Sequence, residues 1–151
     1  MTNQQAPAYP LPPTREISAA AHESLDAVRA AADRLGRVMA VVTAAAVRDI
    51  LTRYTEGAGF DATHIELLEA ADGSLFTKGR YWTADGTERT FAATPGVDDP
   101  EIAVHDINEW TYHLDERTSP VWLTLVTDLP DRNGFTAYRF DLAKAAALPL
   151  D

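Results

Sequence analysis

The apolar positions of this chain follow a helical period first and an alternating period later. Between residues 15 and 56 they recur at spacings of three and four, which is typical of amphipathic helices. The most regular part is a heptad seam flanked by charged residues. Its members are Ala21, Leu25, Val28, Ala32, Leu35, Met39 and Val42. Such a seam indicates either a helix that faces the core or a helix-mediated dimer.

Beyond Thr43 the apolar stripe changes phase and continues through Val47, Ile50 and Tyr54. This shift favours a helical break, with Thr43 as the N-cap of a second helix over 44–56. A single bent helix over 15–56 is the alternative, and it would be about 60 Å long. Because so long a rod could not bury its seam on a small domain, two helices are the expectation.

The middle of the chain alternates apolar and polar residues around two Asp-Gly pairs, Asp72-Gly73 and Asp85-Gly86. Asp-Gly between strand-forming residues is typical of two-residue hairpin turns of the primed type. The pattern predicts a three-stranded antiparallel meander over roughly 63–70, 74–83 and 87–92.

The C-terminal part adds one helix and a second hairpin. Asp99, Pro100 and Glu101 form a helix start, so a helix is predicted over 99–115. Its buried stripe would contain Ala103, Ile107, Trp110 and Leu114. The apolar run Val121–Val126 and the segment Phe135–Phe140 predict paired strands, and Asp141 predicts the cap of a final short helix.

The fold class that follows is α+β. An N-terminal helix or helical hairpin would pack with a mainly antiparallel sheet, made of the meander and the second hairpin, with a helix between them. Residues 1–14 contain four prolines and predict a disordered tail, which leaves residues 15–151 as a single domain.

The composition of the chain indicates the cellular compartment in which the protein is expected. The chain has no cysteine, which excludes disulfides and thiolate chemistry, and no apolar run approaches the length of a membrane span. We therefore expect a cytoplasmic protein. The many alanines and the use of only two lysines are typical of a GC-rich bacterial genome.

The net charge of −10 is concentrated in one region. Residues 60–116 contain 13 acidic and 3 basic residues, so this region carries the whole excess of 10. Such a charge disfavours nucleic acid and anionic membranes, and it indicates either a basic protein partner or simple solubility. The predicted partner-binding residues are Asp98, Asp99, Glu101, Asp106 and Tyr112.

Catalytic signatures are weak. His105, Glu109 and His113 are spaced by four and are the only metal candidates, but on a helix they point away from the predicted stripe. The sequence contains no nucleophile elbow, phosphate-binding loop or zinc motif. We therefore predict no catalytic residues, no cofactor and no required metal.

The favoured function is a non-enzymatic interaction or accessory protein, of inhibitor, immunity or structural type. It would dimerise through the N-terminal helix, at Leu25, Val28, Leu35 and Met39. The alternative is a small-ligand-binding protein or a small enzyme. It would use the sheet face around Arg80 and Trp82, or the row His105, Glu109 and His113.

Overall fold

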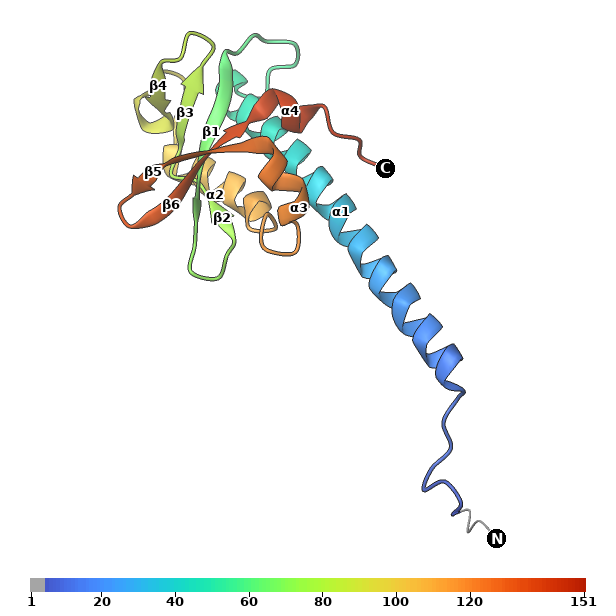
Figure 1. Ribbon diagram of the computed structural model, residues 1–151. Helices are drawn as coiled ribbons and strands as arrows, with labels where there is room; N and C mark the ends of the chain where they lie inside the picture. Colours follow the sequence, from blue (N-terminus) through green and yellow to red (C-terminus); the bar gives the residue numbers. More distant parts are fainter. Residues whose placement is uncertain (1–4) are drawn as a thin grey trace. The chain divides into compact units, whose positions relative to one another are not determined.

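The computed structural model describes residues 5–151, and it contains two compact units, Met1–Ala31 and Ala32–Asp151 (Figure 1). Helix α1 (Thr14–Thr52) belongs to both units. The two-helix expectation is therefore wrong. Thr43 lies inside the helix, where its hydroxyl donates to the Met39 carbonyl at 2.8 Å instead of capping a new start. On both sides of Thr43 the same face of the helix is buried, at Gly36, Ala40, Val47 and Ile50.

The predicted tail covers residues that lie before this helix. Residues 1–4 are outside the described part of the chain, and residues 5–13 are assigned to neither helix nor strand. The helix begins at Thr14, and the backbone N–H groups of Glu16 and Ile17 donate to the Pro13 carbonyl at 3.0 and 3.2 Å. At the other end Arg53 and Tyr54 adopt positive φ angles of 54° and 60°, which stop the helix.

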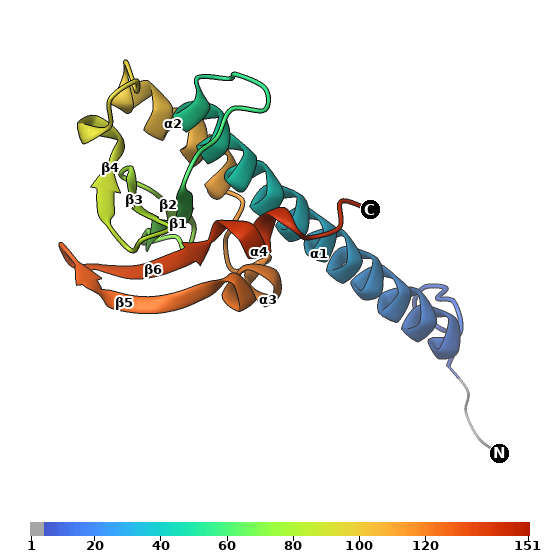
Figure 2. The same cartoon turned by 90° about the horizontal axis from the view of Figure 1, so that it is seen from above.

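The second unit is α+β, as predicted, and its sheet has six antiparallel strands in the described part of the chain (Figures 1 and 2). The strand order is β4-β3-β1-β6-β5, and β2 also pairs with β1. The strands are β1 (Ala62–Glu69), β2 (Leu75–Phe76), β3 (Arg80–Thr83), β4 (Glu88–Thr90), β5 (Val126–Arg132) and β6 (Phe135–Asp141). The helices after α1 are α2 (Pro100–Thr111), α3 (Ser119–Trp122) and α4 (Leu142–Ala146), with 3-10 turns at Phe91–Ala93 and Leu123–Leu125.

The predicted meander is present, but its middle strand is interrupted between β2 and β3. At this gap the side chain of Asn108 in α2 makes the backbone hydrogen bonds that a neighbouring strand would otherwise make. Its side-chain oxygen accepts from the Thr77 N–H at 2.8 Å, and its side-chain nitrogen donates to the Thr77 carbonyl at 3.1 Å. Gly79 follows with a φ of 95°, and a Cβ there would lie 3.0 Å from the ring of Phe91. The helix therefore fixes where the strand breaks.

The hairpin turns differ in type from the prediction. At both Asp-Gly pairs only the glycine has positive φ, whereas a type I′ turn needs it at both central residues and a type II′ turn at the first. The carboxylates of Asp72 and Asp85 instead accept hydrogen bonds from Ser74 and Thr87. The turn between β5 and β6 does have the primed form, because Asn133 and Gly134 both have positive φ.

Helix α2 confirms the predicted start and corrects its buried stripe. The Asp99 carboxylate accepts from the Ile102 N–H at 3.2 Å, and Pro100 follows at the first position. The helix ends at Thr111, so Leu114 is buried in the loop that follows it. Trp110, predicted to be buried, is 39% exposed, and Thr111 is buried in its place. The buried face of α2 is rotated toward Asn108, whose side chain forms hydrogen bonds with the backbone of Thr77.

The predicted strand Val121–Val126 is wrong. The short helix α3 begins at Ser119 with Pro120 in its first turn, a 3-10 turn follows, and β5 begins only at Val126. Val121, Trp122 and Leu125 are buried while Leu123 is exposed, which is a helical spacing. Gly36 explains why α3 lies so close to α1. A Cβ at Gly36 would lie 3.1 Å from the Cβ atoms of Thr118 and Val121.

The core of the second unit lies between the helices and one face of the sheet. Side chains of α1, α2 and α4 pack against Ile65, Leu67, Tyr81 and Phe140. None of the helices between residues 5 and 151 combines the length and apolar character that a bilayer crossing requires.

Candidate functional site

The first unit presents an uncovered apolar stripe on helix α1. Every residue from 5 to 31 is exposed. At 100° per residue, Ile17, Ala21, Leu25 and Val28 lie within a sector of about 80°, and we call these four residues the exposed seam. Ile17, Leu25 and Val28 are 44%, 52% and 65% exposed. The seam is therefore continuous along about three turns of helix.

The charges around this stripe have both signs. Residues 14–31 contain two arginines and three acidic residues. Arg29 lies 3.5 Å from the carboxylate of Asp26 in an exposed pair. The remaining predicted dimer residues, Leu35 and Met39, belong to the second unit and are half-buried, and Met39 packs against its core. The structure thus separates the predicted dimer residues into a fully exposed group and a partly buried group.

A second candidate is a hollow at the end of helix α1, which we call the acidic hollow. It has a volume of about 240 Å³. Arg53 lies on its wall, where Nε donates to the Gly96 carbonyl at 2.7 Å and Nη2 lies 3.5 Å from Asp98 Oδ1. Its lining also includes Ile50, Tyr54, Val97, Asp99, Ile102, Ala103 and Asp106.

Three of the five predicted partner-binding residues meet at this hollow. Asp98, Asp99 and Asp106 line it, and one arginine opposes them. Glu101 is exposed on the same helix but lines a different hollow. Tyr112 is 57% exposed at the end of α2, where its ring packs edge-on against the ring of His113. The acidic hollow therefore contains three of the four predicted carboxylates, and neither Glu101 nor Tyr112.

The predicted metal row is only partly assembled. His105 Nε2 lies 3.5 Å from Glu109 Oε1, and both side chains are well exposed. His113 lies beyond the end of α2 at Thr111. Among residues 5–151, no three side chains of the metal-binding types converge on one position. The geometry does not favour a metal at this row.

The sheet face around Arg80 and Trp82 contains an ion cluster that the sequence did not predict. Glu66 lies in the middle of β1, and its side chain is 2% exposed. Arg132 Nε donates to Glu66 Oε2 at 2.7 Å, and Arg80 Nε lies 3.8 Å from Oε1. Glu88 Oε1 lies 2.7 Å from Arg80 and 3.5 Å from Arg132. We call these four residues the Glu66 cluster.

This cluster links the two edges of the sheet. Glu88 belongs to β4 and Arg132 ends β5, and these strands are the outer members of the strand order (Figure 2). Beside the cluster, the guanidinium carbon of Arg139 lies 4.7 Å from the centre of the Trp82 ring. The Arg139 Nε is buried and has no hydrogen-bond partner among the described residues. Arg80 and Trp82 are therefore engaged within the fold.

His64 borders the same face and has a perturbed pKa. Its Nε2 lies 3.7 Å from Asp141, and its Nδ1 lies 2.8 Å from the Thr63 hydroxyl oxygen. Burial lowers the pKa of His64 below its usual value, and the nearby charge of Arg139 lowers it further, against the opposing effect of Asp141. The neutral imidazole is thus favoured.

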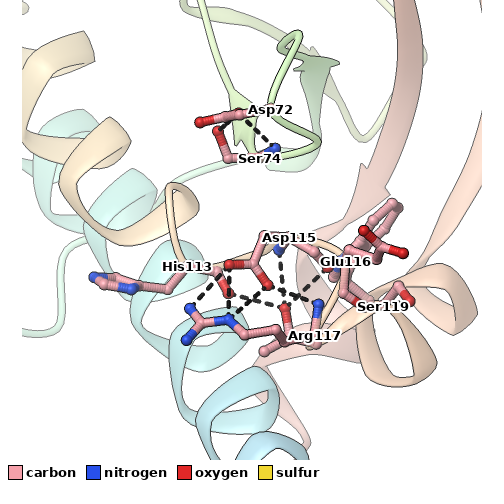
Figure 3. Close-up of polar contacts among 9 residues, drawn as sticks. Asp72, Ser74, His113, Asp115, Glu116, Arg117 and Ser119 are labelled. Carbon is pink, nitrogen blue, oxygen red and sulfur yellow. Dashed lines mark hydrogen bonds and ion pairs between the residues drawn. The ribbon is translucent and has the colours of Figure 1, made fainter.

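The loop between α2 and α3 and the first residue of α3 bring histidine, acidic and serine side chains near one another, but they do not assemble a nucleophile (Figure 3). The Ser119 hydroxyl donates to the Glu116 carbonyl at 2.9 Å, and the His113 ring points away from Asp115 (Figure 3). Asp115 instead binds Arg117, with Nη2 and Oδ2 2.9 Å apart, and this bond raises the pKa of the Arg117 guanidinium. Trp122 Nε1 donates to the Asp115 carbonyl at 2.7 Å. This loop stabilises the junction of the two helices.

Comparisons with family models, with curated proteins and with solved structures return no significant match for this chain.

Proposed function

We propose that this protein is a non-enzymatic interaction protein that associates with a second copy through its N-terminal helix. The observation that carries this proposal is the exposed seam, in which Ile17, Leu25 and Val28 face solvent along one stripe. Scattered exposed apolar residues are ordinary on soluble proteins, whereas a continuous stripe marks an interaction surface. The heptad spacing of the seam makes another helix the fitting partner.

A second copy is favoured because charge does not oppose it. Two arginines and three acidic residues give residues 14–31 a net charge of −1, although the whole chain carries −10. Charges of both signs on the flanks of a heptad seam can pair across two helices. The interface is short, about 27 Å of helix for 18 residues, so we expect weak and concentration-dependent association.

Cysteine cross-linking tests which face of the helix meets the partner. The chain has no cysteine, so each introduced thiol is unique. Ala21→Cys, Leu25→Cys and Val28→Cys sample the seam, and Ala30→Cys samples the opposite face of the same helix. We expect disulfide-linked dimers from at least one seam variant and few from the control. Equal cross-linking on both faces would contradict a seam-mediated dimer.

A second proposal concerns the acidic hollow, which we infer is where a basic protein partner docks. Its support is the convergence of Asp98, Asp99 and Asp106 beside exposed apolar side chains. Tyr54 and Ile102 are 71% and 58% exposed there. Carboxylates beside an apolar contact suit a lysine or arginine side chain, whose stem is apolar and whose head is charged.

A charge-matched comparison tests the second proposal. One variant combines Asp98→Asn, Asp99→Asn, Glu101→Gln and Asp106→Asn, and Asn at 99 preserves the helix cap. The control neutralises Glu16, Glu23, Asp26 and Asp33 on α1, which changes net charge equally. With a fluorescent octalysine peptide as probe, the hollow variant should bind several-fold more weakly than the control. Equal weakening would mean that only net charge matters.

The alternative function, a ligand-binding protein or enzyme at the Arg80 and Trp82 face or at the histidine row, has less support. Arg80 is paired with Glu66 and Glu88, and Trp82 is covered by Arg139. In the histidine row, the side chains of His105 and Glu109 are exposed to solvent. Beside Trp82 only the buried Nε of Arg139 lacks a hydrogen-bond partner among residues 5–151.

A further inference from the structure

A different part of the second unit contains a partly open apolar hollow lined by α1 and α4, which we call the alanine hollow. Its volume is about 330 Å³, within the range of small-molecule sites. The start of β1 and Phe60, which lies shortly before that strand, also line it. Its lining consists of Val41, Ala44, Ala45, Arg48, Phe60, Ala62, Thr63, Leu142, Ala143 and Ala146.

The hollow exists because many of its side chains end at Cβ. Five of the ten lining residues are alanines, contributed by α1, β1 and α4. Ala44 and Ala62 are nearly buried, so the apolar wall reaches into the interior. Phe60 is 47% exposed, which leaves one side of its ring free to cover an occupant. An engineered apolar cavity of about 150 Å³ holds benzene, so this hollow has room for roughly twice that volume.

One charged side chain lies at this apolar wall. Arg48 is the single charged residue among those lining the hollow. Its Nε donates to Asp49 Oδ1 at 3.0 Å, and neither Nη group meets a protein acceptor among residues 5–151. A guanidinium fork binds carboxylates through such paired donors. Arg48 and Phe60 also border a neighbouring, more polar hollow of about 510 Å³, whose lining includes the acidic residues Asp49 and Glu56. The carboxylate of an occupant would therefore have to stay on the Arg48 side of that hollow.

We propose that the alanine hollow binds a small amphiphilic monocarboxylate, with its apolar part between α1 and α4 and its carboxylate on the Nη groups of Arg48. The apolar wall selects the hydrocarbon, and the Nη donors of Arg48, whose Nε is already paired with Asp49, select an anionic head group. This site shares no residue with the exposed seam and does not depend on the assembly proposed above.

The test uses three probes with one hydrocarbon chain: octanoate, octylammonium and 1-octanol. Binding is followed on the ¹⁵N-labelled full chain by amide chemical shifts, at probe concentrations below micelle formation. We expect octanoate to shift amides of residues 44–48, 60–63 and 142–146, and to bind more tightly than the other two probes. Shifts elsewhere only, or tighter binding of octylammonium, would overturn the proposal.

Matched variants separate the two parts of the site. Arg48→Gln should weaken octanoate about two- to fivefold, the loss expected for a half-exposed ion pair, and leave 1-octanol unchanged. Ala45→Leu and Ala146→Leu should fill the hollow from two different helices and weaken both probes. Ala30→Leu on the exposed helix is the control and should change neither.

Two other results would contradict this assignment. If both filling variants remain folded and still bind octanoate as wild type does, the ligand lies elsewhere. If they instead change the oligomeric state while octanoate causes no shifts in the wild type, the hollow holds a side chain of a second copy.

Discussion

Glu66 illustrates how one residue can differ from what its local pattern indicates. In sequence it is the polar member of an alternating strand, between Ile65 and Leu67, and such a residue is expected to face water. In the structure it is buried because Arg132 and Arg80 approach it from two other strands. A buried carboxylate is tolerated only when its charge is compensated. The compensating residues lie 14 and 66 positions away, so no local pattern could identify them.

The first prediction follows from this compensation. Glu66→Gln removes the charge that both arginines face, and we expect a loss of about 1–3 kcal/mol in the free energy of unfolding. Glu88→Gln is the control. Because the Glu88 side chain is 43% exposed, its removal should cost less than about 1 kcal/mol. Urea denaturation of both variants measures the difference. Equal losses of unfolding free energy in the two variants would show that the buried carboxylate of Glu66 contributes no more to stability than the exposed one of Glu88.

His64 gives a prediction about pH. Since its pKa is lowered in the folded protein, the unfolded chain binds more protons below the ordinary histidine pKa of 6.5. The contribution of His64 to stability is therefore present at neutral pH and is lost as the pH falls through 6.5 toward the folded pKa. We expect the melting temperature to fall less steeply from about pH 7.5 to about pH 5.5 in His64→Gln than in wild type. Parallel profiles would contradict this role.

At the scale of elements, the sequence correctly predicts where α2 and α4 begin, but it does not predict α3 or the gap between β2 and β3. Asp99 and Asp141 cap α2 and α4 as expected, because capping depends on neighbours in the chain. Val121–Val126 was misread because a short apolar run fits a buried helix as well as a strand. The gap between β2 and β3 could not be predicted, since it depends on Asn108 bonding Thr77 across the fold.

Gly36 provides the prediction at this scale. Its lack of a side chain lets α3 approach α1, and Val121 Cβ would lie 3.1 Å from a Cβ placed there. Gly36→Val should therefore destabilise the protein by about 1–3 kcal/mol through overpacking. The control, Ala30→Val on the exposed part of the helix, should cost less than about 1 kcal/mol. Chemical denaturation compares the two variants. An unchanged free energy of unfolding in Gly36→Val would show that α3 can move away from α1 at little cost.

At the scale of the whole molecule, the fold class followed from the sequence but the sites did so only in part. The heptad spacing predicts four dimer residues. Of these, Leu25 and Val28 are exposed, whereas Leu35 and Met39 are half-buried. Charge counting identified the acidic region, and three of its carboxylates meet at one hollow. The alanine hollow had no sequence signal, because alanines in helices predict helix rather than empty space.

The proposed function depends most on whether the exposed seam joins two copies. Sedimentation equilibrium of the full chain measures this directly over a wide range of concentrations. We predict a concentration-dependent monomer–dimer equilibrium for wild type and a folded monomer for Leu25→Asp combined with Val28→Asp, with Ala30→Asp on the opposite face behaving as wild type. A wild type that stays monomeric and fully folded at every concentration would contradict the account.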